Sequence, residues 1–391
     1  MSEVTNIDRL SAARGPGAPG NSTHIAWVCD RAAEKGGIAR GLSDMYPFFP
    51  PSCRIDFIAP VNARFEQLEA DGATVHKDLG RFPRVSGVLW SALSLVPAAR
   101  AILRLKPNVV IVDHTNGLRV MGLLKYLGYS GFLVYRNHGV EFLQRQPWVA
   151  RCLLRCCDLV VTVCPGEATT LSALTDKQVV VVPNCIPHAA MLCERSEPSR
   201  GGLTVGYVGA VTRDKGIFEF IDVLNRVGDS VPSARGTVRG TVYSSRYLGE
   251  SVAALHNRVA ATNRCSMQGE TSRSHVFDDL MFLAVSSRRE SFGLTILEAP
   301  FYNVLPVAFD SVGPRFLLKD VAPELLVPCG DTSAMAARLL MLFKSPARRS
   351  VLLSQLRRSF QERFSPQIVA TNFVSVIENH ANVHARSLGT V

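Results

Sequence analysis

Short apolar runs rich in β-branched residues, separated by segments of helix length, limit the possible folds of this 391-residue chain more than any other feature. Such runs are typical of parallel strands whose sheet is covered by helices on both faces. In the first half of the chain we expect strands over residues 24–29, 55–59, 109–113, 132–136, 159–163 and 179–182. The segments between them, for example 91–105 and 118–127, are long enough to form helices. The pattern therefore predicts an α/β domain.

A second series of runs predicts a second α/β domain, with strands over residues 203–208, 237–243, 265–268, 281–285, 305–309 and 325–327. Open parallel sheets bind ligands at the carboxyl ends of their strands, so we expect the site in a cleft between the two sheets. Residues 366–381 have the apolar spacing of an amphipathic helix. The expected organisation is a flexible arm over 1–22, domains over 23–183 and 203–365, a linker over 184–202 that is rich in proline, glycine and charge, and a C-terminal helix with its tail over 366–391.

The charge balance limits the choice of partner. The chain has 43 Lys and Arg residues against 33 Asp and Glu, a net charge of +10, and a basic chain favours an anionic partner. Nucleic acid, an anionic lipid surface and a phosphorylated small molecule all fit that charge. Because the basic residues are scattered and no nucleic-acid motif occurs, we expect no nucleic-acid partner.

Cysteine spacing and hydropathy indicate the compartment. The ten cysteines form no C-x-x-C pair and no zinc-ligand spacing, and we interpret them as small apolar residues of a cytoplasmic protein. Residues 1–22 are polar, unlike a signal peptide. The longest uncharged run, 85–99, has 15 residues, whereas a membrane-spanning helix needs about 20. We expect this run to be a buried helix of the first domain; the alternative is peripheral contact with an anionic membrane.

A literal G-x-G-x-x-G occurs at Gly15, Gly17 and Gly20, which is the spacing of dinucleotide-binding loops. A working loop of this kind follows a strand and begins a helix. Here prolines lie inside the motif and no strand precedes it, so we do not interpret it as a cofactor site.

Two carboxylates occur in the most informative segment, 286–310, which reads SSRRESFGLTILEAPFYNVLPVAFD. Glu290 lies in a turn after a predicted strand, and Glu298 lies eight residues later in a predicted helix. Eight helical residues span about 12 Å, whereas the carboxyl pairs of glycosidases lie about 5–9.5 Å apart. The spacing therefore disfavours a glycosidase and suits an elongated ligand with hydroxyls at both ends. The alternative is a first-turn acid favoured by the helix dipole, followed by a solvated glutamate.

The same segment offers backbone donors. Phe292, Gly293 and Leu294 stand where the helix is expected to begin, and free N–H groups at a helix N-terminus bind anions.

A second candidate anion site lies in residues 204–216, TVGYVGAVTRDKG. The segment predicts a strand and a loop, followed by a helix from Ile217. Arg213 and Lys215 stand beside the start of that helix, where N–H groups and two cations suit a diphosphate. A surface turn with solvated charges is the alternative.

The first domain has two weaker candidates. Gly36 and Gly37 lie between the first strand and its helix, where glycine lets a ligand approach the backbone closely. His138 follows the strand over 132–136, at the edge where a ligand is expected, although a lone histidine is more often structural. His114, after the preceding strand, is a competing candidate.

Together and in this order, the Gly-Gly loop, HG, PN before the linker, KG before a second-domain helix and ESFGLTILEA followed by PV resemble the retaining GT-B glycosyltransferases of family 4. The resemblance covers about residues 24–381. It implies two Rossmann-like domains on either side of a cleft that binds a nucleotide-diphosphate sugar, with the last helix crossing back to the first domain.

The resemblance also implies roles for particular residues. Glu290 would contact hydroxyls of the donor sugar, Glu298 would hold the ribose, and Lys215 would neutralise the diphosphate. The implied catalytic residues are His138 and Glu290, and the implied donor-binding residues are Gly37, Lys215, Phe292, Gly293, Leu294 and Glu298. The family mechanism is front-face: the leaving phosphate takes the acceptor proton. Because the chain has no D-x-D motif, we expect no obligatory metal, and no cofactor is implied.

Three positions depart from the family pattern. Ala210 stands where an arginine is usual, Cys185 follows the PN pair in place of glycine, and Asn303 stands where glycine is common. We expect Arg213, two residues before Lys215, to bind the donor as the second cation of the loop.

The predicted function is transfer of a sugar from a nucleotide-diphosphate sugar to an unidentified acceptor: a glycan, a lipid-linked molecule or a small molecule. A sugar-nucleotide epimerase or a phosphorylase on the same fold is an alternative. A non-catalytic relative that binds anions is another.

Overall fold

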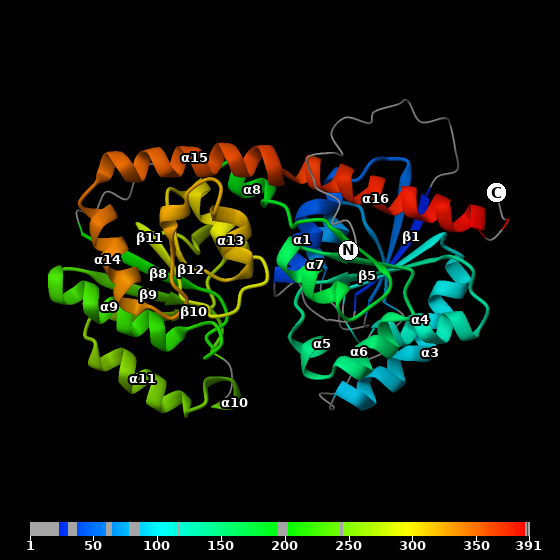
Figure 1. The fold of residues 1–391 in the computed structure, drawn as a ribbon, viewed down its shortest axis with the longest axis horizontal. Coiled ribbons are helices and arrows are strands. Elements are labelled where there is room, and N and C mark those ends of the chain that lie inside the picture. The colour runs from blue at the N-terminus through cyan, green and yellow to red at the C-terminus, as the bar shows by residue number, and fades with distance from the viewer. Residues whose placement is uncertain are drawn as a thin grey trace. The chain divides into compact units, whose positions relative to one another are not determined.

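The computed structural model describes residues 23–29, 37–59, 65–77, 87–113, 115, 117–193, 202–242, 245–387 and 389; the side chains at 37–40, 87–94, 141–142 and 245–246 are outside this description. The predicted arm, with its G-x-G-x-x-G, lies outside the described residues, as do Gly36 and His114. The chain divides into two compact units (Figure 1). The first comprises Met1–Cys185 and Pro366–Val391, and the second comprises Ile186–Ser365.

In the first unit, the described residues form a seven-stranded parallel sheet in the order β3-β2-β1-β4-β5-β6-β7. This is a doubly wound, Rossmann-like order, because the chain starts in the middle and moves outward twice. The strands are β1 (Thr23–Val28), β2 (Cys53–Ile58), β3 (Thr74–His76), β4 (Val109–Val112), β5 (Phe132–Asn137), β6 (Leu159–Thr162) and β7 (Gln178–Val181).

Helices cover both faces of this sheet, as apolar parallel strands require. On one face, α16 (Pro366–Ser387) packs beside α1 (Gly37–Met45), and its residues Val369, Phe373 and Ile377 join a core with β1 and β2. The other face carries a separate core, to which α3 and α4 contribute Ile102 and Leu124. The remaining helices of the unit are α2 (Glu66–Ala70), α3 (Gly87–Leu105), α4 (Gly117–Tyr126), α5 (Glu141–Arg145), α6 (Pro147–Leu154) and α7 (Pro165–Ser172).

The described residues of the second unit form a six-stranded parallel sheet with the same winding, in the order β10-β9-β8-β11-β12-β13. The strands are β8 (Thr204–Val208), β9 (Arg235–Arg239), β10 (Cys265–Gly269), β11 (Phe282–Val285), β12 (Leu305–Phe309) and β13 (Leu326–Val327). The helices are α8 (His188–Met191), α9 (Ile217–Ser230), α10 (Ser245–Leu248), α11 (Val252–Ala261), α12 (Leu294–Glu298), α13 (Val312–Leu318), α14 (Thr332–Phe343) and α15 (Pro346–Phe364).

Three elements differ from the sequence prediction. β3 was not predicted, because its three residues are only half-buried or exposed. The strand predicted over 237–243 is displaced to Arg235–Arg239: Gly240 has φ +157°, and beyond it Val242 forms only an isolated bridge with Val211. The C-terminal helix extends six residues past the predicted end at 381, to Ser387.

In the part of the chain that the structure describes, no helix combines the length and the apolar character needed to cross a bilayer. Within the run 85–99, the described side chains of Ala98 and Ala99 are buried in the first unit, whereas Val96 is half-exposed.

Candidate functional site

Two of the predicted site residues meet at the carboxyl edge of the second sheet. Lys215 lies in the loop after β8, and Glu290 lies in the turn after β11, the neighbouring strand. Lys215 Nζ lies 2.7 Å from Glu290 Oε2. The lysine side chain is 37% exposed and the glutamate 20%, so the pair remains accessible to a ligand. The fold thus brings together a cation and a carboxylate that are 75 residues apart in the sequence.

A glycine holds the Lys215 loop against the end of β11. Gly216 has φ +76°, and a Cβ there would lie 1.9 Å from the carbonyl oxygen of Ser286. Ser286 Oγ donates to the carbonyl of Gly216 at 2.7 Å, and Ser287 Oγ donates to that of Lys215 at 3.4 Å. These two serines were not predicted as site residues, although they come shortly before Glu290 in the sequence. They determine the place from which Lys215 extends.

The turn after Glu290 also depends on glycine. Gly293 has φ +98° and precedes α12, which begins at Leu294 as predicted. The Phe292 ring is buried against Phe316 and Phe364, so its side chain belongs to the core. The first N–H groups of a helix have no acceptor within the helix.

Glu298, at the end of α12, is buried and already bound by a cation. Its Oε1 accepts a hydrogen bond at 3.2 Å from Nη2 of Arg273, which lies in the 3₁₀ turn η3 (Arg273–His275). Arg273 was not predicted as a site residue, because nothing in the sequence around it indicates that it binds Glu298.

Arg213 is exposed, and its main chain braces the loop. Its N–H donates to Tyr247 at 3.0 Å, and its carbonyl accepts from Gly216 at 3.0 Å. The guanidinium lies beside Gly249, where a Cβ would be 3.2 Å from Nη1. Among the ion pairs of the described residues, none joins Arg213 to Glu290; the cation beside Glu290 is Lys215.

In the first unit, His138 meets a buried carboxylate. His138 follows β5 and Asp113 follows β4, the adjacent strand. His138 Nε2 lies 3.3 Å from Asp113 Oδ1, and Trp27 Nε1 donates to Asp113 Oδ2 at 2.7 Å. Arg136 Nη1 lies 3.8 Å from Oδ1. Burial raises the pKa of Asp113, but the hydrogen bond from His138 and the charge of Arg136 outweigh it, so the pKa lies below its usual value.

The PN pair contacts Arg136, a partner of this carboxylate. Gly37 is the first residue of α1. Asn184 of the PN pair accepts a hydrogen bond from Arg136 Nη2 at 3.2 Å, and its Oδ1 lies 3.5 Å from the position of a Cβ on Gly41. Asn184 therefore has a structural role that the sequence motif alone did not show.

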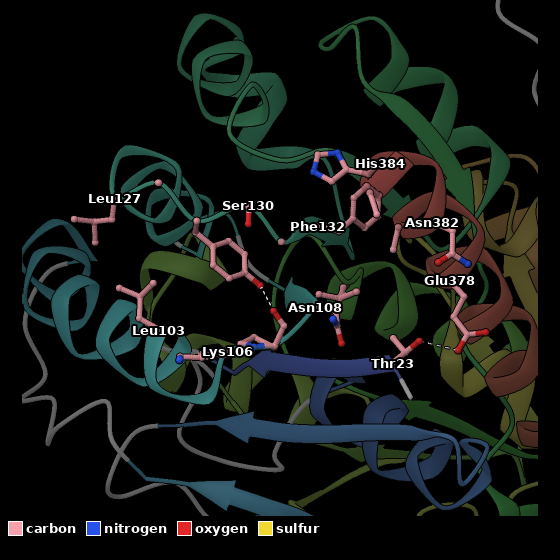
Figure 2. Close-up of a pocket in the computed structure, with 17 residues that line it drawn as sticks. Thr23, Leu103, Lys106, Asn108, Leu127, Ser130, Phe132, Glu378, Asn382 and His384 are labelled. Atoms are coloured by element: carbon pink, nitrogen blue, oxygen red, sulfur yellow. Dashed lines mark hydrogen bonds between the residues drawn. The ribbon is translucent and has the colours of Figure 1, made fainter. Parts of the chain in front are cut away.

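A groove outside the predicted site lies at the opposite, amino edge of the first sheet. Its volume is about 550 Å³, and Figure 2 shows Leu103, Leu127 and Lys106 at one end and Thr23 and Glu378 at the other. Thr23 Oγ1 donates to Glu378 Oε1 at 2.9 Å, which ties β1 to α16 there.

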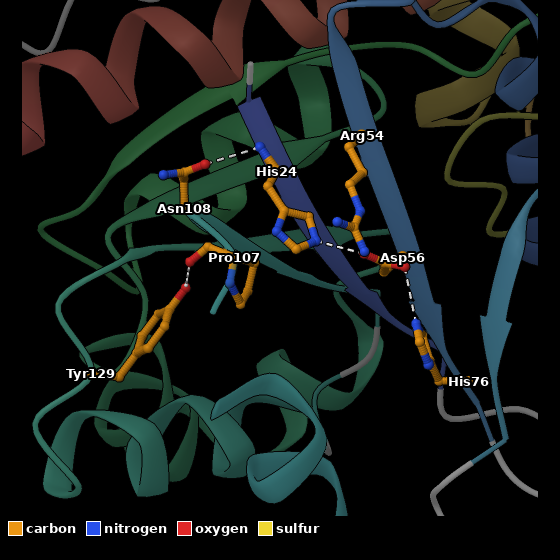
Figure 3. A network of polar contacts seen from close by, with 7 residues as sticks. All are labelled: His24, Arg54, Asp56, His76, Pro107, Asn108 and Tyr129. Carbon is orange, nitrogen blue, oxygen red and sulfur yellow. Dashed lines mark hydrogen bonds and ion pairs between the residues drawn. The ribbon is translucent and has the colours of Figure 1, made fainter. Parts of the chain in front are cut away.

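A second polar network crosses the strands of the first sheet (Figure 3). Asp56, in the middle of β2, accepts from His24 of β1 at 2.6 Å and from His76 of β3 at 2.9 Å, and Arg54 lies 2.9 Å away. Burial raises the pKa of Asp56, but these three partners lower it more, so the net pKa is below its usual value.

The described residues contain no group of three or more His, Cys, Asp or Glu side chains placed to hold a metal ion. All ten cysteines are described, and none forms a disulfide. Cys29, Cys157, Cys164 and Cys185 are buried, as expected for small core residues, and burial raises the pKa of Cys164 to about 11. Cys152 and Cys329 are exposed, so the interpretation does not extend to all of them.

Comparison with known proteins shows a family likeness within the second unit. Residues 202–345 match the family Glycosyl transferases group 1. The chain is 30% identical over 198 residues to 2-deoxystreptamine N-acetyl-D-glucosaminyltransferase of Streptomyces fradiae; the match covers 49% of this chain and 46% of that enzyme. The chain therefore matches about half the length of this relative. Within the second unit, residues 202–345 therefore resemble a glycosyltransferase domain, in agreement with the resemblance that its motifs carry.

Solved structures show the same fold over about 91% of the chain. HepE of Anabaena, in complex with UDP-glucose, has a TM-score of 0.75 at 16% identity, over 91% of this chain and 99% of HepE. Sucrose-phosphate synthase of Thermosynechococcus elongatus has a TM-score of 0.70 at 17% identity, over 91% of this chain and 98% of the synthase. The predicted GT-B architecture, with two Rossmann-like units and a helical C-terminus, is confirmed.

Proposed function

We propose that this protein is a glycosyltransferase that moves a sugar from a nucleotide-diphosphate sugar to an acceptor, with retention of the anomeric configuration, as in family 4. The observation that carries the proposal is the Lys215–Glu290 pair at the carboxyl edge of the second sheet, within the residues that match Glycosyl transferases group 1. Ligands of open α/β sheets bind at that edge.

The pair suits a donor that carries both phosphate and sugar hydroxyls. Without a ligand, Lys215 and Glu290 neutralise each other at 2.7 Å. When the donor binds, the ammonium turns to the diphosphate, and the released carboxylate accepts hydrogen bonds from hydroxyls of the sugar. Glu298 is proposed to hold the ribose from its place beside Arg273. Backbone N–H groups at Phe292, Gly293 and Leu294 are proposed to bind the donor as well.

In the proposed front-face reaction, the bond between the anomeric carbon and the leaving phosphate breaks, and the bond to the acceptor oxygen forms on the same face. The acceptor proton passes to the leaving phosphate oxygen. The charge that develops on the diphosphate is stabilised by Lys215, without an obligatory metal. From the first unit, Gly37 is proposed as a further donor contact, and His138 as a contact near the reacting carbon.

Arg213 is proposed as a second cation for the diphosphate, in place of the arginine missing at Ala210. Arg213 is exposed and lies two residues from Lys215, and the planar fork of N–H donors on its guanidinium fits two phosphate oxygens at once. We expect Arg213→Ala to reduce transfer about as much as Lys215→Ala, and the double variant to lose less than the sum. A change below about twofold, typical of a surface site, would show that Lys215 acts alone.

The direct test is a thermal-shift panel of nucleotide-sugar donors, followed by transfer and hydrolysis assays on the best donor. UDP-glucose, which is bound to HepE, and UDP-N-acetylglucosamine are the first donors to try. The first acceptor to try is 2-deoxystreptamine, which appears in the name of the Streptomyces relative. We expect a donor-specific rise in melting temperature that Lys215→Ala removes and that Lys319→Ala, at an exposed lysine of the same unit, retains.

The assays also separate the alternatives. Turnover of the donor without any acceptor and without hydrolysis would indicate an epimerase, and turnover that requires phosphate as acceptor would indicate a phosphorylase. A stabilising shift that depends only on salt, with no turnover, would indicate an anion-binding relative. Activity that survives chelation supports the absence of an obligatory metal.

Two proposals concern location. We propose that the protein works in a reducing compartment, the cytoplasm, because none of its ten cysteines forms a disulfide. Peripheral contact of residues 85–99 with an anionic membrane is tested by co-sedimentation with anionic vesicles at low salt. The absence of binding there would leave the buried-helix interpretation.

A further inference from the structure

We propose that Asp113 is a positioning residue: it holds the His138 ring in one orientation and one tautomer at the carboxyl edge of the first sheet, and sugar transfer depends on that. The catalytic part of this inference rests on the proposed function. The part about the tautomer does not, and the experiment reads it separately.

The hydrogen bond between His138 and Asp113 determines which ring nitrogen carries the proton. An ionised carboxylate has acceptor sites only, so a ring nitrogen that is hydrogen-bonded to it must carry the proton. Because Nε2 of His138 faces Oδ1 of Asp113 at 3.3 Å, the structure assigns the Nε2–H form to His138. In the neutral ring, Nδ1 is then an acceptor. The carboxylate thus decides which nitrogen donates and which accepts.

Asp113 itself has little freedom to move. Its side chain is 3% exposed, and Oδ2 accepts from the indole N–H of Trp27 at 2.7 Å. The Trp27 ring is stacked on Phe373 of α16, with ring centres 5.3 Å apart. A carboxylate held on one oxygen by a buried indole presents its other oxygen in a single direction, toward His138.

A buried cation shares the charge of Asp113 with His138. Arg136 is 1% exposed, lies 3.8 Å from Asp113, and has its guanidinium over the rings of Trp27 and Phe373. The charge of Asp113 is therefore offset in part from inside the protein, and His138 is not its only charged partner. His138 stands at the edge of the sheet where ligands of such sheets bind.

The test is Asp113→Asn, which keeps the shape of the side chain. Trp27 still needs an acceptor, so the amide oxygen turns to the indole and the NH₂ group faces His138. That arrangement requires Nε2 to accept, and the ring changes to the Nδ1–H tautomer. Nitrogen NMR of ¹⁵N-histidine-labelled protein, with His138→Ala to assign the signals, should show Nε2–H in the wild type and Nδ1–H in the variant.

On transfer, we expect kcat of Asp113→Asn to fall about 100-fold or more, with little change in KM for the donor. The double variant with His138→Ala should be no slower than His138→Ala alone, because Asp113 acts only through that ring. Asp56→Asn is the matched control: the same substitution at a buried aspartate that also bonds histidines should leave kcat unchanged.

Several outcomes would overturn the proposal: an Nδ1–H ring in the wild type, an unchanged tautomer in Asp113→Asn, or a further loss from Asp113→Asn in the His138→Ala background. If the tautomer changes as expected but no donor turns over in the wild type, the proposed function fails and the positioning role of Asp113 stands. If Asp113→Asn does not fold, Trp27→Phe removes the indole donor and retains an aromatic ring. It should then lower kcat without changing KM, and an unaltered kcat would overturn the proposal.

Discussion

Asp113 and Asp56, two aspartates of the first sheet, have similar partners and different positions along their strands. Both are buried, both bond a histidine Nε2, both lie within 4 Å of an arginine, and both have a pKa below the usual value. Asp56 lies in the middle of β2, whereas Asp113 stands just past the end of β4. The cluster that faces the ligand edge is the one proposed for function.

The partners of Asp56 show what the inner position is used for. His24 and His76 come from β1 and β3, the strands on either side, so one carboxylate links three neighbouring strands (Figure 3). β3 has only three residues, and such a short edge strand gains from a side-chain bond to the sheet. Similar residue chemistry thus stabilises the sheet at one place and orients a candidate catalytic ring at the other.

The largest effect is expected at a third carboxylate, at the same edge of the other sheet. Glu290→Gln should lower transfer by at least about 100-fold, because the amide keeps the shape but loses the charge that binds sugar hydroxyls in the transition state. Nucleotide binding, measured by thermal shift, should persist. Glu298→Gln should instead raise KM for the donor more than it lowers kcat. Wild-type turnover in both variants would end the transferase interpretation.

The next effect sharpens the comparison through two glycines. Gly216→Ala places a Cβ 1.9 Å from the carbonyl of Ser286 and should move Lys215, at a cost of about 10- to 100-fold in kcat. Gly72, in the turn before β3, has a similar φ of +84° and no atom within 4 Å of a Cβ. Gly72→Ala should cost about 1 kcal/mol of stability and no activity. Equal activities of the two variants would contradict the proposed role of the Lys215 loop.

Asp56→Asn should change stability and not turnover. It leaves one amide oxygen where a carboxylate accepted from two histidines, so one of the two bonds is lost. A hydrogen bond to a charged group contributes about 1.5–3 kcal/mol, and we expect a loss of that size. Urea unfolding, followed by a signal from the first unit, measures the loss. A fall in kcat with unchanged stability would break the division between the two aspartates.

The smallest effect is expected in acid. Because the pKa of Asp56 is lower in the folded protein than in the unfolded chain, its stabilising contribution is complete above the unfolded value of about 3.9 and is lost as the pH falls through the lower folded value. Unfolding free energies between pH 6 and pH 3 should therefore fall more steeply for the wild type than for Asp56→Asn. Parallel curves would show that the folded and unfolded pKa values are the same.

The local parts of this molecule were readable from the sequence. The starts of α9 at Ile217 and α12 at Leu294 were predicted, each directly after a glycine, and Lys215 and Glu290 were identified separately as candidate site residues. Their ion pair was not predicted, because it depends on β8 and β11 being neighbours in the sheet. Contacts between segments that are distant in the sequence could not be predicted from it. The Arg273–Glu298 bond and the Trp27–Asp113 bond depend on strand register and packing, to which no spacing in the sequence corresponds.

The first unit is built from two segments that lie before and after the second unit in the sequence, and this order has a consequence for biosynthesis. A ribosome releases residues 1–185 long before it makes α16, whereas residues 186–365 are complete before α16 appears. The second unit can therefore finish folding while the first still lacks Val369, Phe373 and Ile377 from its core. The Trp27 ring, which donates a hydrogen bond to Asp113, obtains its stacking partner Phe373 only when α16 has been synthesised. A nascent chain that stops before residue 366 carries a finished second unit and an unfinished His138 cluster.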